Sequence, residues 1–163
     1  MAAISTAARN NFHLLGVEDT ERVIAIDRAH TGRASRRFFE KRLAAAKVNP
    51  DDFIPIGVMR GGALRGFAIA RILRGEFGHE RAVAVLDAVG VELEGQERGI
   101  GQFLMAELTK TMQRMGVCSL QSQADWTNHS LLRFFSAAGF KLSPRIALER
   151  SVSELLDETI EEV

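Results

Sequence analysis

Apolar residues recur along the chain with two spacings, one typical of strands and one typical of helices. Alternation predicts strands at 12–15, 54–60, 64–73, 82–91 and 118–126, then two short strands at 140–142 and 145–148. Helical spacing predicts a helix that ends near His30, one that Ser35 caps, and others at 99–115, 128–138 and 151–163. Two early helices, a meander of strands and then alternating strands and helices indicate an α/β fold around one sheet.

Turn residues and apolar faces refine these elements. Gly61 and Gly62 predict a hairpin turn, and Gly116 and Gly139 end the helices that precede them. If the strand at 82–91 is regular, one of its sides carries Val83, Val85, Asp87, Val89 and Val91. The helix at 99–115 has an apolar face of Leu104, Leu108, Met112 and Met115.

Composition limits the class of protein. The 163 residues suit one domain spanning 1–163, with an acidic amphipathic segment at 151–163. Lys and Arg total 21, as do Asp and Glu, so the charge gives no signal for nucleic acid or an acidic membrane. No apolar run approaches the ~20 residues that cross a bilayer, and no secretory leader is apparent. The single cysteine, Cys118, is expected in the core, the histidine spacing suggests no metal, and a cytoplasmic location is the simplest expectation.

The most informative stretch runs from Val89 to Gly101, where a valine-rich strand enters a loop whose glycines open a helix. Gly99 and Gly101 allow close approach of a ligand to the backbone, and the helix start offers unpaired N–H groups that suit a phosphate. Arg98 adds a cation. The Gly-Lys-Ser/Thr ending of nucleotidase loops is absent, and Leu104 replaces the third glycine of the dinucleotide fingerprint. A glycine-rich turn without a ligand is the structural alternative.

The hexapeptide from Gln96 to Gly101 resembles the Gln/Arg-x-x-Gly-x-Gly/Ala signature of the GNAT superfamily of N-acetyltransferases. Asn128, Phe135 and Gly139-Phe140 resemble that family's downstream Asn, tyrosine and Gly-Phe run, so the resemblance covers most of the chain. It implies a mixed, mostly antiparallel central sheet, flanked by helices, whose fourth and fifth strands splay apart. It also implies an enzyme that moves an acetyl group from acetyl-CoA to an amine by direct attack.

The same resemblance implies where acetyl-CoA binds as co-substrate. Backbone groups of Val89, Gly90 and Val91 would hold the pantetheine arm in the splay, and Asn128 would bind near the thioester. The pyrophosphate would lie against the loop and helix start formed by Gln96, Glu97, Arg98, Gly99, Ile100, Gly101 and Gln102. Glu97 departs from the pattern because it places a negative charge near phosphate.

Two departures bear on catalysis: Phe135 stands where many members have a proton-donating tyrosine, and Gln123 where some have a glutamate base. An alkyl ammonium with a pKa of ~10 must lose a proton before it attacks a thioester, so a base is needed. Asp87 and Glu92 are the candidate bases, with Asp125 as a third. The structural alternatives are an Asp87 ion pair with Arg71 or Arg81, a solvated loop position for Glu92, and a turn-shaping role for Asp125.

The acceptor and partners are less defined. In the family the link between the first two helices, here His30 to Arg33, covers the acceptor. Arg33, Arg36 and Arg37 would attract an anionic group of the acceptor, or form a solvated helix face. A small-molecule amine and a protein amine both remain open, and a homodimer through the terminal segment is expected because many members are dimers. An acyl-CoA-binding sensor or an interaction domain is the alternative function.

Overall fold

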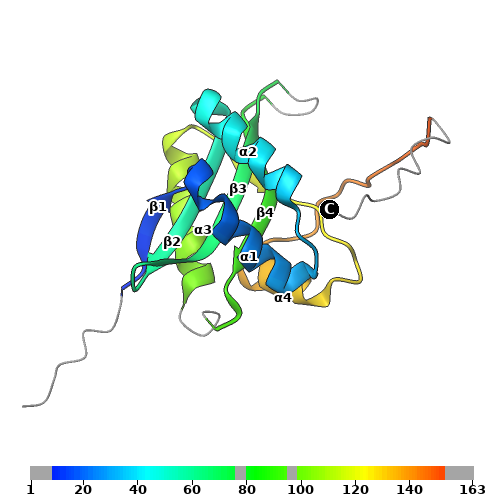
Figure 1. Ribbon diagram of the computed structural model, residues 1–163. Coiled ribbons are helices and arrows are strands. Elements are labelled where there is room, and N and C mark those ends of the chain that lie inside the picture. Colours follow the sequence, from blue (N-terminus) through cyan, green and yellow to red (C-terminus); the bar gives the residue numbers. More distant parts are fainter. Residues whose placement is uncertain (1–8, 76–79, 95–98, 153–163) are drawn as a thin grey trace, which may run out of the picture. The chain divides into compact units, whose positions relative to one another are not determined.

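The computed structural model of the chain describes residues 9–75, 80–94 and 99–152 (Figure 1). The chain divides into two compact units, Met1–Ala124 and Asp125–Val163. Within the described residues, the first unit contains the sheet and three α-helices, and the second contains one α-helix followed by an extended segment at 140–152.

The first unit is built on a five-stranded sheet in the order β1-β2-β3-β4-β5. Its strands are β1 Asn11–Leu14, β2 Phe53–Arg60, β3 Ala63–Leu73, β4 Val83–Val91 and β5 Ser119–Gln121. Neighbouring strands are antiparallel except β4 and β5, which are parallel. The helices are α1 Thr20–Thr31, α2 Arg36–Val48 and α3 Ile100–Arg114, with short 3-10 turns at Val17–Asp19 and Pro50–Asp52. The predicted order of elements is confirmed as far as β5.

Helices cover both faces of the sheet. In Figure 1, α1 and α2 lie in front of the strands and α3 lies behind them. Helix α1 packs on β3 and β4, α2 packs on β2, and α3 packs on β2, β3 and β4. The front core includes Phe39 of α2 and Phe67 of β3, whose rings meet edge to face with centroids 5.5 Å apart. The predicted apolar face of α3 is confirmed for Leu104, Leu108 and Met112, to which the structure adds Ile100.

Strand β3 contains a β-bulge at Arg65. Val58 of β2 pairs with Gly66 and Met59 pairs with Leu64, so Arg65 has no partner on β2. The extra residue brings Leu64 to the same core as Phe67 and Ile69, although regular alternation would turn it to the opposite face. The backbone next to Arg65 therefore changes direction at the point where β3 meets the end of β4.

A second bulge lies at Asp87 in β4. Ile69 pairs with Ala88 and Ala70 pairs with Leu86, which leaves Asp87 without a partner on β3. Strand β4 is therefore not regular, so the condition under which Asp87 would share a side with Val89 and Val91 is not met. Asp87 faces α2, while the Val91 side chain lies beside Gly66, to which α3 packs.

Strand β5 is shorter than the predicted 118–126. It pairs with β4 only at Val83, Ala84 and Val85. At the next residue the Ser122 hydroxyl donates a hydrogen bond to the Leu86 carbonyl at 3.1 Å, in place of a ladder bond. Because a bulge bends and twists its strand, the bulge at Asp87 ends the parallel pairing and separates the two strands beyond it.

The second unit contains α4, His129–Ala137, with Asn128 as its N-cap. The Asn128 Oδ1 accepts the backbone N–H of Leu131 at 3.1 Å. Phe135 packs between the rings of Phe134 and Phe140, with centroids 5.8 and 4.7 Å away.

The two final strands predicted at 140–142 and 145–148 are wrong. Residues 140–152 form no strand, and Leu142, Ile146 and Leu148 are at least 86% exposed. Alternation of apolar residues predicts a strand only where a partner strand is available, and none pairs with this segment in the described chain. Residues 153–163, which carry most of the predicted terminal helix, lie outside the described residues.

Glycine at position 90 is required by the packing of α1 on the sheet. A Cβ atom there would lie 2.7 Å from the Phe67 ring and 3.2 Å from Ile26 Cγ2, and both neighbours are buried. Strand β4 therefore lies closer to the aromatic core at Gly90 than any residue with a side chain permits.

We predict that Gly90→Ala lowers the free energy of unfolding by about 1–3 kcal/mol, because the added methyl group overpacks the core. Urea denaturation measures this cost. In the double variant Gly90→Ala/Phe67→Leu the smaller side chain relieves the clash, so the combined cost should be less than the sum of the single costs. A double variant whose loss in free energy of unfolding equals the sum of the two single losses would contradict this prediction.

Candidate functional site

The part of β4 beyond the bulge has one open backbone edge. Glu92 N–H donates to Arg65 O at 2.7 Å, which makes Glu92 and Arg65 a hydrogen-bonded pair of the β3–β4 ladder. Hydrogen-bonded and non-hydrogen-bonded pairs alternate along an antiparallel ladder. Gly90, paired with Phe67, therefore bonds to β3, whereas the backbone groups of Val89 and Val91 point away from β3. They face the side on which β5 no longer pairs.

His30 occupies one of these outward groups. Its Nε2 lies 2.5 Å from the carbonyl oxygen of Val91, so Nε2 carries the hydrogen and donates it. This bond fastens the C-terminal turn of α1 to the last residue of β4. Of the predicted pantetheine contacts, Gly90 is thus turned toward β3, and the carbonyl of Val91 is engaged by His30. The N–H groups of Val89 and Val91 and the carbonyl of Val89 face the open edge.

The N-terminus of α3 offers a second set of backbone donors. Its first intrahelical bond runs from Phe103 N–H to Gly99 O at 3.0 Å, so the N–H groups of Ile100, Gly101 and Gln102 have no acceptor within the helix. Gly99 adopts a left-handed φ of 68°, and a Cβ atom there would meet no atom of the described residues within 4 Å, its chain neighbours apart. The space beside Gly99 suits an anion, which the positive end of the helix dipole favours.

Gly66 of β3 holds these two sets of donors together. It pairs with Val91, and an ideal Cβ on it would lie 2.9 Å from Ile100 Cγ2 and 3.6 Å from Val91 Cγ2. The absence of a side chain at Gly66 therefore lets the first residue of α3 approach the end of β4. The site is built on β3 as well as on the motif that the sequence shows.

Glu92 is held by two arginines. Arg22 Nη2 of α1 donates to Glu92 Oε1 at 2.5 Å, and Arg65 Nη1 donates to Oε2 at 2.7 Å. Burial acts to raise the pKa of Glu92, but the hydrogen bonds from Arg65 and Arg22 outweigh it and leave the pKa below 4.5. The expected solvated loop position for Glu92 is wrong, because its carboxylate is partly buried and bound at both oxygens.

Asp87 is also paired. Arg71 donates to it through two nitrogens, from Nε to Oδ2 at 2.6 Å and from Nη2 to Oδ1 at 3.0 Å. Arg42 Nε lies 3.1 Å from Oδ2, at an angle that does not make a hydrogen bond. The Asp87 side chain is only 8% exposed. The predicted alternative of an ion pair with Arg71 is confirmed, and Arg42 is an additional partner.

A third carboxylate, Asp27 of α1, was not predicted from the sequence as a site residue. It lies one helical turn before His30, whose ring binds the Val91 carbonyl at the end of β4. Within the part of the chain that the structure describes, its hydrogen-bond donors are the hydroxyls of Ser35 and Thr31, and none is an arginine. Burial raises the pKa of Asp27 above 3.8, and these hydroxyls together with the charge of His30 offset this only in part.

One residue that binds Asp27, Ser35, was predicted to have another role. Ser35 is the N-cap residue of α2 by position, as predicted, but its side chain makes no capping hydrogen bond. Its hydroxyl binds Asp27 instead. Arg36 is held by Glu21 and Glu40, whereas Arg33 and Arg37 are exposed.

The remaining predicted site residues have different environments. Gln96, Glu97 and Arg98 lie outside the described residues. Asp125 accepts the Thr127 N–H at 2.8 Å and the Thr127 hydroxyl at 2.6 Å, and these bonds lower its pKa, in agreement with a turn-shaping role. Cys118 is exposed, so its predicted core position is wrong; its N–H binds the Ala82 carbonyl just before β5.

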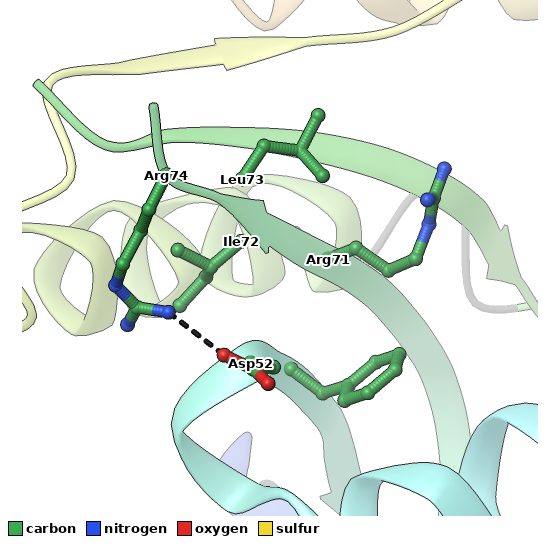
Figure 2. A pocket seen from close by; sticks show the side chains of 6 residues that line it. Asp52, Arg71, Ile72, Leu73 and Arg74 are labelled. Atoms are coloured by element: carbon green, nitrogen blue, oxygen red, sulfur yellow. Dashed lines mark hydrogen bonds and ion pairs between the residues drawn. The ribbon is translucent and has the colours of Figure 1, made fainter. Parts of the chain in front are cut away.

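A separate open pocket of about 460 Å³ lies where β2 begins and β3 ends (Figure 2). Leu73 pairs with the first residue of β4, so this pocket is at the opposite end of the sheet from Val91. Figure 2 shows Arg74 directed at Asp52, and their hydrogen bond measures 2.8 Å. The other cation of the pocket, Arg71, is bound to Asp87, so the chain's own carboxylates neutralise both.

A comparison with models of protein families finds a match over most of the chain. A family model described as the acetyltransferase (GNAT) family matches residues 18–140, a range that includes parts of both units. No curated protein matches the sequence. None of the described helices is long and apolar enough to cross a membrane, and the described residues contain no group of three His, Cys, Asp or Glu side chains that could hold a metal.

Solved structures share the fold at low sequence identity. Aminoglycoside N-acetyltransferase AAC(6')-Iy in complex with CoA has a TM-score of 0.73 and 18% identity, over 93% of this chain and 100% of that one. AAC(6')-Ih from Acinetobacter baumannii has a TM-score of 0.72 and 14% identity, over 88% of this chain and 98% of that one. Ribosomal-protein-alanine N-acetyltransferase from Brucella melitensis biovar Abortus 2308 has a TM-score of 0.69 and 16% identity, over 88% of this chain and 99% of that one.

We predict that Gly99→Ala weakens the binding of acetyl-CoA, because the methyl group enters the open space beside the N-terminus of α3. Gly116→Ala is the matched control: Gly116 follows the other end of α3, has a φ of 71° and also faces open space. Both variants carry the same left-handed strain, of about 1 kcal/mol. Calorimetric titration should show a weaker affinity for Gly99→Ala only. Equal affinities in the two variants would contradict the site.

Proposed function

Because the chain belongs to the acetyltransferase (GNAT) family, it transfers an acetyl group from acetyl-CoA to an amine, and we propose that the open edge of β4 and the N-terminus of α3 form its cofactor site. The observation that carries this proposal is the end of β4–β5 pairing at Val85, six residues before β4 itself ends. Beyond Val85 the edge of β4 has no partner strand among the described residues, and the outward N–H groups of Val89 and Val91 lie on this edge.

Each part of this site suits one part of acetyl-CoA. The outward N–H and carbonyl of Val89 suit the amides of an extended pantetheine arm, which would add to β4 as a strand does. The N–H groups of Ile100, Gly101 and Gln102 suit the pyrophosphate. Gln96, Glu97, Arg98 and Asn128 join the proposed site through the family resemblance alone. The outward N–H of Val91 is the donor proposed for the oxyanion that forms on the thioester carbonyl.

The reaction needs an acceptor for the proton of the amine. The nitrogen attacks the thioester carbonyl, the new C–N bond forms, the C–S bond breaks and CoA leaves as a thiolate. Asp87 and Glu92 are the bases predicted from the sequence, but Arg71 occupies both carboxylate oxygens of Asp87, and Arg22 and Arg65 occupy those of Glu92 and lower its pKa. Asp27, which none of the described arginines binds, is the base that we favour, directly or through one water molecule. Phe135 cannot donate a proton, so solvent protonates the thiolate.

The acceptor that we propose is a small-molecule amine. AAC(6')-Iy is by its name an aminoglycoside N-acetyltransferase, which makes small amines the first class to test. Arg33 and Arg37 add a preference for an amine that also carries an anionic group, since both lie at the α1–α2 link and form no ion pair within the described residues. A thiol-release assay with acetyl-CoA and a panel of amino acids, aminoglycosides and peptide N-termini tests this. Binding of acetyl-CoA without turnover of any amine would favour an acyl-CoA sensor.

We further propose that the two units form one acetyltransferase domain, because the family model covers parts of both. A cytoplasmic location fits the single, exposed cysteine, which a reducing compartment keeps as a thiol. The exposed apolar residues of the extended segment support a homodimer, in which a second copy covers Leu142, Ile146 and Leu148.

We predict that Asp27→Asn lowers kcat about 100-fold, the usual contribution of a general base, and leaves the affinity for acetyl-CoA unchanged. The same change should raise the melting temperature at neutral pH. The raised pKa of Asp27 means that folding disfavours its charged form, a cost that asparagine avoids. The gain in stability should vanish as the pH falls below 3.8, where the carboxyl is protonated in both states. A stabilised variant with full kcat would show that Asp27 is not the base.

We predict that Ile146→Asp shifts the protein from dimer to monomer in sedimentation velocity experiments, because it places a charge in the proposed apolar interface. Lys141→Asp, an exposed polar position in the same segment, is the control and should leave the dimer intact. A wild-type protein that sediments as a monomer at all concentrations would rule out the dimer.

A further inference from the structure

The ion pairs of Glu92 join three elements at the point where β4 ends. Arg22 belongs to α1, Arg65 to the bulge of β3, and Glu92 follows the last residue of β4. Arg22 also donates from Nε to the Leu64 carbonyl at 2.9 Å, so one guanidinium binds both β3 and Glu92. Together with the Glu92 N–H···O bond to Arg65, four hydrogen bonds hold the end of β4 against residues 64–65 of β3.

The same short part of β3 also supports the proposed site. Gly66, the next residue, pairs with Val91 and receives Ile100 at the start of α3. Residues 64–66 of β3 therefore fix the position of both sets of backbone donors, those of β4 and those of α3. A change in how Glu92 is held would move Val91 relative to Ile100.

The geometry points to Glu92, Arg22 and Arg65 as a positioning clamp, which sets the distance between the end of β4 and the N-terminus of α3 and thereby the affinity for acetyl-CoA. This inference rests on the proposed function, because it assumes that acetyl-CoA spans these two elements. Glu92 then acts through the backbone of Val91 rather than on the amine. Neither arginine belongs to the motif that suggested the site.

Other roles for Glu92 and its ion pairs predict different effects of their loss. If Glu92 were the general base, its loss would lower kcat and leave acetyl-CoA affinity unchanged. If the ion pairs only stabilised the fold, their loss would lower the melting temperature without a change in affinity or in kcat. The clamp alone predicts weaker acetyl-CoA binding with kcat retained at saturation.

The experiment uses the full chain with Glu92→Gln, Arg65→Gln and the double variant. Asp52→Asn is the control, because it breaks a charged pair at the opposite end of β3. Calorimetry gives the Kd for acetyl-CoA, steady-state kinetics give kcat and KM, and thermal unfolding gives the melting temperature. We expect Glu92→Gln to raise Kd and KM about tenfold, the equivalent of about one charge-assisted hydrogen bond. The double variant should have a Kd for acetyl-CoA no higher than that of Glu92→Gln, because both changes break the same interaction.

Two results would overturn the clamp: a loss of kcat with unchanged Kd, or an affinity equal to that of Asp52→Asn. If Glu92→Gln fails to fold, Arg65→Lys keeps the charge but loses the planar fork, and it should raise Kd by a smaller factor. An unchanged Kd in that variant would also contradict the clamp. A wild-type protein that does not bind acetyl-CoA would refute the proposed function itself. If the wild type binds acetyl-CoA and the variants bind it with the same Kd, only the clamp is refuted.

Discussion

The β-bulge at Asp87 is the constraint on which the proposed site depends. One extra residue in β4 ends the parallel ladder with β5 after Val85 and leaves the backbone edge at Val89 and Val91 open. The bulge also turns the Asp87 carboxylate toward Arg42 of α2 and Arg71 of β3. A bulge leaves backbone groups without ladder partners, a cost that these ion pairs help to offset. The opening in the sheet and the buried charges are therefore two consequences of one local insertion.

Asp87 lies on β4, Glu92 directly follows β4 and Asp27 lies on α1, and these three carboxylates differ in their hydrogen-bond partners. Asp87 and Glu92 each contact two arginines, which tie together the elements that carry them. Among the described residues Asp27 has only hydroxyl donors, and burial raises its pKa. A carboxylate that folding disfavours in its charged form gains from taking up a proton, whereas one bound by guanidiniums loses its partners when it does so. The environment of each side chain, rather than its residue type, distinguishes the proposed base from the two acids that arginines bind.

The order of helices and strands as far as β5 was predictable from the sequence, because apolar spacing and turn glycines are local signals. The Gln96–Gly101 motif likewise located the start of α3. The bulges at Arg65 and Asp87 were not predictable, since each depends on residues of a neighbouring strand and helix. The arginine partners of Glu92 lie 70 and 27 positions away in the chain. The strands predicted at 140–142 and 145–148 failed because alternation describes a side-chain pattern and does not supply a partner strand.

Gly66 shows why the sequence motif is only half of the site. The motif supplies the glycines at the start of α3, but a helix start binds a ligand held on β4 only if the two elements are close. An alanine at position 66 would push Ile100, which is fully buried, away from the end of β4. Glycine there weakens β3 as a strand, by roughly 0.5–1 kcal/mol relative to alanine. The two arginines at Glu92 hold the adjoining backbone, so the place where β3 lacks a side chain is also the place where ion pairs constrain it.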